Sequence, residues 1–158
     1  MNWFRMGFCR LIQRKLGMAL SLSARDWWML TQAWFLLLMF DLGLRLLPFR
    51  QVQRVAARAM RRGEEQRTAQ AWAAIQRTQR LVGIAARYHL YPMRCLPRAL
   101  ALQWLLNKQG IRTELRIGVR KEGAQFSAHA WLEYEGRALE APDVAERFVP
   151  LIAAEAER

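Results

Sequence analysis

The chain has 158 residues and a mass of 18.5 kDa, the size of one ordinary domain, which excludes a large multidomain machine. With 53% apolar and 24% charged residues, it can bury a hydrophobic core and lacks the polar bias of a disordered protein. Its two cysteines, Cys9 and Cys95, are too few for a disulfide framework or a four-cysteine zinc site. We therefore expect a single-domain protein of the reducing cytoplasm.

Positive charge is concentrated in the first part of the chain. The net charge is +12, and residues 1–62 carry eleven Lys and Arg residues against Asp26 and Asp41, a net of +9. Such an excess indicates an anionic neighbour, which could be nucleic acid, an acidic peptide, a partner protein or a membrane, although Arg-rich helices are often only solvated. Because zinc-finger spacing, RNP aromatics and a GxxG loop are missing, nucleic acid is not expected. The sequence also contains no phosphate loop or metal-binding motif, so we expect no cofactor and no metal.

The amino-terminal region does not resemble a targeting sequence. Residues 1–22 form a basic extension in which the polar residues 13–15 interrupt the apolar stretch, which argues against a signal peptide. The apolar run at residues 27–40 has fourteen residues between Asp26 and Asp41, fewer than the roughly 20 needed to span a bilayer. We favour a buried core helix, with a surface docked on a partner or a bilayer as the alternative.

Four helices are predicted before residue 110. The first begins after a Ser23 cap, where Asp26 completes a capping box, and ends near Leu47 because Pro48 follows. The other three are expected over residues 50–62, 64–88 and 98–108. Cys95 is expected where the chain enters the last of these helices.

Beyond Gly110 the hydrophobic period changes to alternation, which predicts strands. These strands are expected over residues 112–119, 126–134 and 137–140, with a turn at residues 121–123 and a hairpin at Glu135-Gly136. Helices followed by an antiparallel sheet indicate the α+β class.

Cys95 is a candidate nucleophile because of its place at a helix start. The positive end of the helix dipole, with Arg94 and Arg98 beside it, favours the thiolate form. The alternative is that Cys95 is only a small buried apolar residue.

His129 is the candidate partner of this thiol. Strand alternation places it on one face with Trp131 and Glu133, and an imidazole facing a helix-terminal cysteine can form a thiolate–imidazolium pair that protonates a leaving amine. A strand histidine can also be purely structural. The other histidine, His89, is expected in a loop or at a helix end.

The group that would orient the imidazole depends on the hairpin. A two-residue Glu135-Gly136 loop places Glu140 on the His129 face, whereas a three-residue loop with a bulge places Asp143 there. Both acids remain candidates, and acids after a hairpin can also serve only solubility.

Three segments resemble a known family. RCLPRALALQWLLNKQGIRTELRIGVRK (residues 94–121) and FSAHAWLEYEGRALE (126–140) are similar to the transglutaminase-like cysteine peptidases of lasso-peptide biosynthesis, the B-type proteins related to the microcin-processing enzyme. LSARDWWMLTQAWFLLLMFDLGLRLLPFRQV (22–52) resembles that family's helical part. The resemblance implies a papain/transglutaminase-like fold, with a helical region at 23–90 and a catalytic core at 91–158 forming one compact unit.

The resemblance also implies a function. A peptidase of this kind removes the leader from a ribosomally made precursor, and a separate ATP-dependent cyclase then closes the ring. Cys95 matches the nucleophile and His129 the general base, while the downstream Glu146-Arg147-Phe148 favours Glu140 as the acid and leaves Asp143 second. In the split form of the family a separate leader-recognition protein is the partner, and the basic helices would hold the acidic leader or that protein.

Two other functions are compatible with these residues. A transglutaminase-like acyltransferase would use the same triad with an amine in place of water. A non-enzymatic basic helical module would bind nucleic acid or a membrane surface, which the charge and the seven Trp residues favour, but we rank it lower because the basic residues are scattered.

Overall fold

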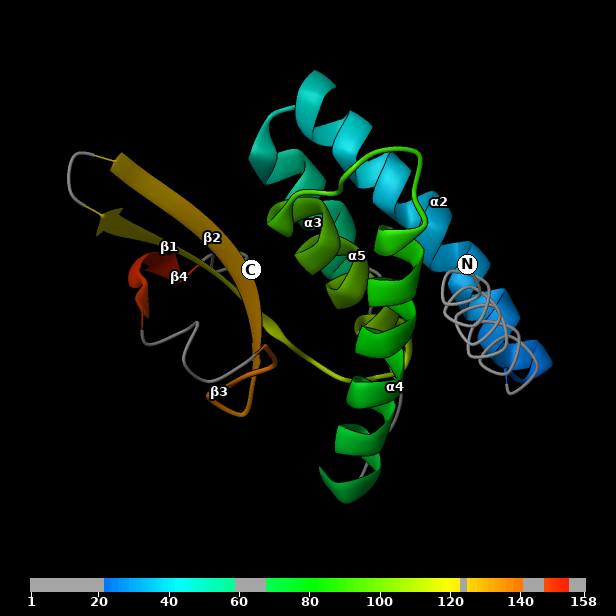
Figure 1. The fold of residues 1–158 in the computed structure, drawn as a ribbon. Helices are drawn as coiled ribbons and strands as arrows, with labels where there is room; N and C mark the ends of the chain where they lie inside the picture. Colours follow the sequence, from blue (N-terminus) through cyan, green and yellow to red (C-terminus); the bar gives the residue numbers. More distant parts are fainter. Residues whose placement is uncertain (1–21, 59–67, 123–124, 141–146, 154–158) are drawn as a thin grey trace, which may run out of the picture.

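A computed structural model describes residues 22–58, 68–122, 125–140 and 147–153. In this part of the chain, four helices lie beside one antiparallel sheet with strand order β3-β2-β1-β4 (Figure 1), so the α+β class is confirmed. The helices are α2 (Ala24–Leu46), α3 (Phe49–Arg58), α4 (Thr68–Arg87) and α5 (Cys95–Lys108). The strands are β1 (Glu114–Glu122), β2 (Gln125–Tyr134), β3 (Arg137–Ala138) and β4 (Val149–Ala153).

α5 is the central element of the fold. It contacts α2, α3 and α4 as well as β1 and β2, and nine of its 14 residues are buried. The apolar core runs from this helix to the inner faces of α2 and α4 and to one face of the sheet, through Leu115, Ala130 and Leu132. Asn107 ties α3 to the same helix because its Nδ2 donates a 3.1 Å hydrogen bond to the carbonyl oxygen of Ala56.

Most helix bounds follow the predictions, and one differs for a clear reason. α5 begins at Cys95, three residues before the expected start, because Pro97 lies in the first turn, where a missing N–H is tolerated. The expected end of the second helix near residue 62 and the expected start of the third at 64 lie outside the described residues.

The sheet differs from the predicted one in three places, the first being β3, which ends at Ala138 and not at residue 140. The β1–β2 ladder continues to the pair Glu122 and Gln125, so residues 121 and 122 belong to β1 and not to the turn expected at 121–123. β4 was not predicted; it pairs with β1 at the edge of the sheet, where Pro150 is tolerated because an edge strand needs fewer donors.

One side of α2 lies in the core and the other is exposed. The structure therefore matches neither the predicted buried helix nor the alternative of a docking surface by itself. Ala33, Leu37 and Phe40 are buried, whereas Phe35 is 61% and Leu46 is 79% exposed. The helix does not end at Asp41, and its 23 residues include an 18-residue window of mean hydropathy 1.3. By length and composition alone the whole helix could cross a membrane, a test that the core helix of a soluble protein also passes.

The start of α2 is fixed by the predicted capping box and by an ion pair. Ser23 Oγ accepts from the Asp26 backbone N–H at 3.2 Å, and the Asp26 carboxylate accepts from Ser23 and, at 2.6 Å, from Nε of Arg77 on α4. The Arg77 hydrogen bond, followed by that of Ser23, holds the pKa of Asp26 well below its usual range.

We expect Asp26→Asn to lower the free energy of unfolding at neutral pH by an amount that becomes smaller as the pH falls below about 4. A carboxylate with a lowered folded pKa stabilises the fold above its unfolded pKa of about 4, and this contribution is lost as the pH falls through the folded value. Urea unfolding at pH 7 and at pH 3 measures the difference, with the exposed Glu135→Gln variant as the control. An equal loss at both pH values would contradict the ion pair as its source.

Candidate active site

Cys95 is the first residue of α5 and lies where the helix has no side-chain cap. Its N-cap, Arg94, is extended (φ −70°, ψ 164°) and makes no capping hydrogen bond through its side chain. The Arg94 side chain therefore leaves the backbone N–H groups of Cys95 and Leu96 uncapped, and these two can donate to a bound oxyanion, whereas Pro97 has no N–H. The free thiol is half-buried against the core.

The segment before Cys95 is anchored on α2. Tyr91 donates its hydroxyl to Asp41 Oδ2 at 2.7 Å, and Arg45 pairs with the same carboxylate at 2.8 Å. The hydrogen bond to Asp41 raises the pKa of Tyr91 because it stabilises the protonated phenol. His89 stacks on Trp34 with ring centroids 4.7 Å apart and meets the Tyr91 ring edge-on at 5.4 Å, so this second histidine packs within the segment that precedes α5.

His129 lies at the border of the helix–sheet interface. The first four residues of β2 are exposed and the three after His129 are buried, so the imidazole lies where the strand leaves the helical layer. Its Nε2 is 2.7 Å from Oε2 of Glu140. Because Nε2 contacts the carboxylate, Nδ1 is the ring nitrogen left for exchange of a proton with a nucleophile or leaving group.

The hairpin after β2 brings Glu140 to this imidazole. Glu133 pairs with Ala138 and Tyr134 with Arg137, which leaves a two-residue loop. Both loop residues have positive φ, 50° for Glu135 and 72° for Gly136, as a type I′ turn requires. The structure therefore has the two-residue register of the two alternatives, and Asp143 lies outside the described residues.

Two aromatic rings flank the imidazole. The Trp131 ring is stacked at a centroid distance of 6.3 Å and an angle of 13°, and the Phe148 ring lies at 5.3 Å. Trp131 is itself fixed because its Nε1 donates to Oε1 of Glu133 at 3.1 Å, and Oε2 of Glu133 accepts from Nε of Arg116 at 2.9 Å. The imidazole thus has few orientations open to it.

Gly118 provides the space for these rings. It pairs with His129 across the β1–β2 ladder, and a Cβ there would lie 2.8 Å from Cη2 of Trp131 and 2.9 Å from Cβ of Phe148. Neither Gly118 nor Phe148 was identified as part of the site from the sequence. The available signal was a glycine inside a strand pattern, which often marks a close approach.

Cys95 and His129 lie on elements that pack together, but no hydrogen bond connects their side chains in the described part of the chain. α5 packs on β2, and β1 runs back along α5 after the Gly110 turn (Figure 1). The core-facing residues of β2 are Ala130 and Leu132, so His129 belongs to the opposite set in the alternation. Among the described residues there is no hydrogen bond between the thiol and the imidazole. The structure thus joins His129 to Glu140 and holds Cys95 on the neighbouring helix.

The sequence matches the family described as the transglutaminase-like superfamily over residues 34–153, from within α2 to the end of β4. The chain belongs to the transglutaminase-like superfamily. This superfamily includes cysteine peptidases and acyltransferases. No curated protein and no solved structure matches the chain.

The matched residues cover most of the chain, so this transglutaminase-like domain includes helices from both the 23–90 region and the 91–158 region. In the part of the chain that the structure describes, no group of three or more His, Cys, Asp or Glu side chains could hold a metal ion.

Proposed function

We propose that this transglutaminase-like protein is a cytoplasmic cysteine peptidase that removes the leader from a ribosomally made lasso-peptide precursor. The observation that carries the proposal is the 2.7 Å contact of His129 with Glu140 on the strand against which the Cys95 helix packs. The choice of a lasso-peptide precursor comes from the sequence resemblance in residues 22–52, 94–121 and 126–140.

The reaction would proceed through a thioester. The Cys95 thiolate attacks the scissile carbonyl carbon, and the oxyanion forms beside the uncapped backbone N–H groups at the start of α5. His129, protonated at Nδ1, gives its proton to the leaving amine as the C–N bond breaks. It then accepts a proton from the water that attacks the thioester, and the C–S bond breaks to release the carboxylate product and the thiolate.

Glu140 acts on this cycle through His129. Its carboxylate accepts the Nε2–H, which fixes the tautomer and stabilises the imidazolium that forms during the reaction. No hydrogen bond joins the thiol to His129 among the described residues, so the proposal requires the two groups to come within proton-transfer distance when a substrate is bound. Catalytic hydrogen bonds often tighten only in the substrate complex.

The partners in this proposal are anionic. Arg50, Arg54 and Arg58 are exposed on α3 at four-residue spacing, whereas Val52 and Ala56 of the same helix are buried. One face of α3 is therefore a row of cations that can hold an acidic leader or a leader-recognition protein. The peptide amine released by cleavage would pass to the ATP-dependent cyclase.

Cys95→Ala should abolish cleavage and leave the fold intact. The substituted side chain is half-buried and small, so we expect thermal unfolding to change little while kcat/KM falls by about 10⁴-fold or more. The measurement is mass spectrometry of a candidate precursor incubated with the protein and its leader-recognition partner. Cys9→Ala, which removes the other cysteine, is the matched control and should cleave at the normal rate.

Product mass separates the two reactions open to this site. Hydrolysis adds one water across the cleaved bond, whereas an acyltransferase joins the acyl group to an added amine. Full cleavage by the Cys95→Ala protein would contradict the proposal, and an amine adduct formed only by the unsubstituted protein would identify the acyltransferase instead.

A further inference from the structure

The outer face of α2 is an apolar stripe. Trp28, Phe35, Met39, Leu42 and Leu46 are between 45% and 79% exposed, and their spacing of seven, four, three and four residues places them on one side of the helix. Ala33, Leu37 and Phe40 occupy the opposite, buried side. A continuous exposed row of large apolar residues is typical of an interaction surface.

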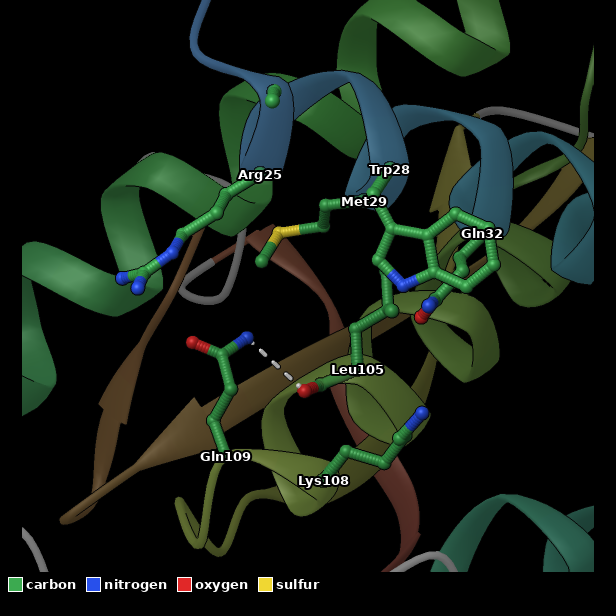
Figure 2. A pocket seen from close by; sticks show the side chains of 8 residues that line it. Arg25, Trp28, Met29, Gln32, Leu105, Lys108 and Gln109 are labelled. Carbon is green, nitrogen blue, oxygen red and sulfur yellow. Dashed lines mark hydrogen bonds between the residues drawn. The ribbon is translucent and has the colours of Figure 1, made fainter.

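At the amino-terminal end of α2, Trp28 of this stripe lines a hollow in the surface. The hollow has a volume of about 480 Å³ and lies between α2 and the last turn of α5 (Figure 2). Trp28, Met29 and Leu105 supply its apolar walls. Its size falls within the range of small ligand sites, so it can accept one or two side chains of a partner.

The charged groups of this hollow are cations. Arg25 of α2 and Lys108 of α5 line it from opposite helices (Figure 2), and none of the described residues that line it is acidic. The neighbouring Asp26 is buried and paired with Arg77 of α4, so it does not neutralise them. An occupant therefore needs both an apolar group for the walls and negative charge at the rim.

Side chains on α5 and α2 also suit a polypeptide. Gln109, the C-cap residue of α5, is fixed by 3.1 Å hydrogen bonds from its Nε2 to Thr78 Oγ1 and to the Leu105 carbonyl oxygen, so this wall is preformed. Figure 2 shows the hydrogen bond to Leu105. Gln32, also in the lining, has no hydrogen-bond partner among the described residues and can bond a peptide backbone. A bilayer presents no protruding side chain to such a hollow, which favours a peptide over a membrane.

We propose that this surface, made of the α2 stripe and the hollow, binds an acidic segment of a partner polypeptide. A bulky apolar side chain of the partner fills the hollow, and carboxylates flanking it lie beside Arg25 and Lys108. The hollow is at the end of α5 opposite Cys95, about 20 Å away along the helix axis. It is therefore a docking site separate from the candidate active site, and binding to it does not require the proposed peptidase activity.

The test uses a random library of twelve-residue displayed peptides selected on the purified full chain. We expect the selected sequences to be enriched in Asp and Glu flanking an aromatic residue or Leu. A synthetic peptide of the consensus sequence, followed by fluorescence anisotropy, should bind at least tenfold more weakly to the Arg25→Glu/Lys108→Glu protein and to Trp28→Ala. Arg80→Glu and Phe126→Ala, which change an exposed cation and an exposed aromatic residue outside the hollow, are the matched controls.

Two further measurements, together with the selection and the variants, decide the result. Cys95→Ala should bind the peptide unchanged, which separates this proposal from the proposed function. Absence of acidic enrichment, or equal binding by the hollow variants and their controls, would overturn it. Vesicles containing phosphatidylglycerol that bind through the same residues and displace the peptide would identify the surface as a membrane face and also overturn it.

Discussion

Glu140→Gln should lower kcat by about 10²- to 10⁴-fold while KM changes little. The neutral amide cannot stabilise the imidazolium form of His129, and its NH₂ group donates to Nε2, which selects the wrong tautomer for proton transfer at Nδ1. Single-turnover cleavage followed by mass spectrometry measures the loss in the chemical step, separately from binding and product release.

The same prediction has a graded control. Glu140→Asp keeps the carboxylate on a shorter side chain and should retain more activity than Glu140→Gln. Glu135→Gln changes an exposed acid in the same hairpin, which has no contact with the imidazole, and should cleave normally. Equal activity of Glu140→Gln and the unsubstituted protein would remove Glu140 from the mechanism and leave Asp143 as the acid to test.

Local signals in the sequence were enough for the starts of some elements. The Ser23 and Asp26 capping box lies within one turn, so its geometry follows from four consecutive residues. The alternation of β2 likewise predicted which residues share the face of His129. Both features depend on neighbours in the chain, which is why they could be identified without the fold.

The hairpin register could not be derived from the sequence. The two-residue loop requires Glu135, a non-glycine residue, to adopt a φ of 50°. Whether the loop forms depends on whether hydrogen-bond pairing along the whole ladder offsets the free-energy cost of that conformation. β4 was missed for a similar reason, because its pairing with β1 joins segments about 30 residues apart and Pro150 weakens the strand pattern. α2 is apolar on two sides, so its periodicity could not separate core from surface.

Gly118→Ala should both destabilise the fold and impair the candidate active site. The added Cβ would come within 3 Å of Trp131 and Phe148, which is closer than van der Waals contact. Trp131 is 1% exposed and its indole N–H is bonded to Glu133, so moving the ring is costly and we expect a loss of about 1–3 kcal/mol in the free energy of unfolding. Urea unfolding measures this loss.

The effect on catalysis follows from the rings that flank His129. Displacing Trp131 or Phe148 moves the imidazole that lies against them, and a shift of about 1 Å in a reacting group can cost roughly 10²-fold in rate. We therefore expect kcat to fall by about that factor at a temperature where the variant is still folded, with the Glu140 contact weakened.

Gly83→Ala is the matched control for this substitution. Gly83 lies within α4 and a Cβ there would meet nothing within 4 Å, so the same change should stabilise the protein by about 0.5–1 kcal/mol and leave cleavage unaffected. Trp131→Phe in the Gly118→Ala background removes the atoms nearest to the new Cβ and should restore part of the stability. If Gly118→Ala were as stable and as active as Gly83→Ala, the rings would not be held against His129 as the structure has them, and its orientation would have to depend on Glu140 alone.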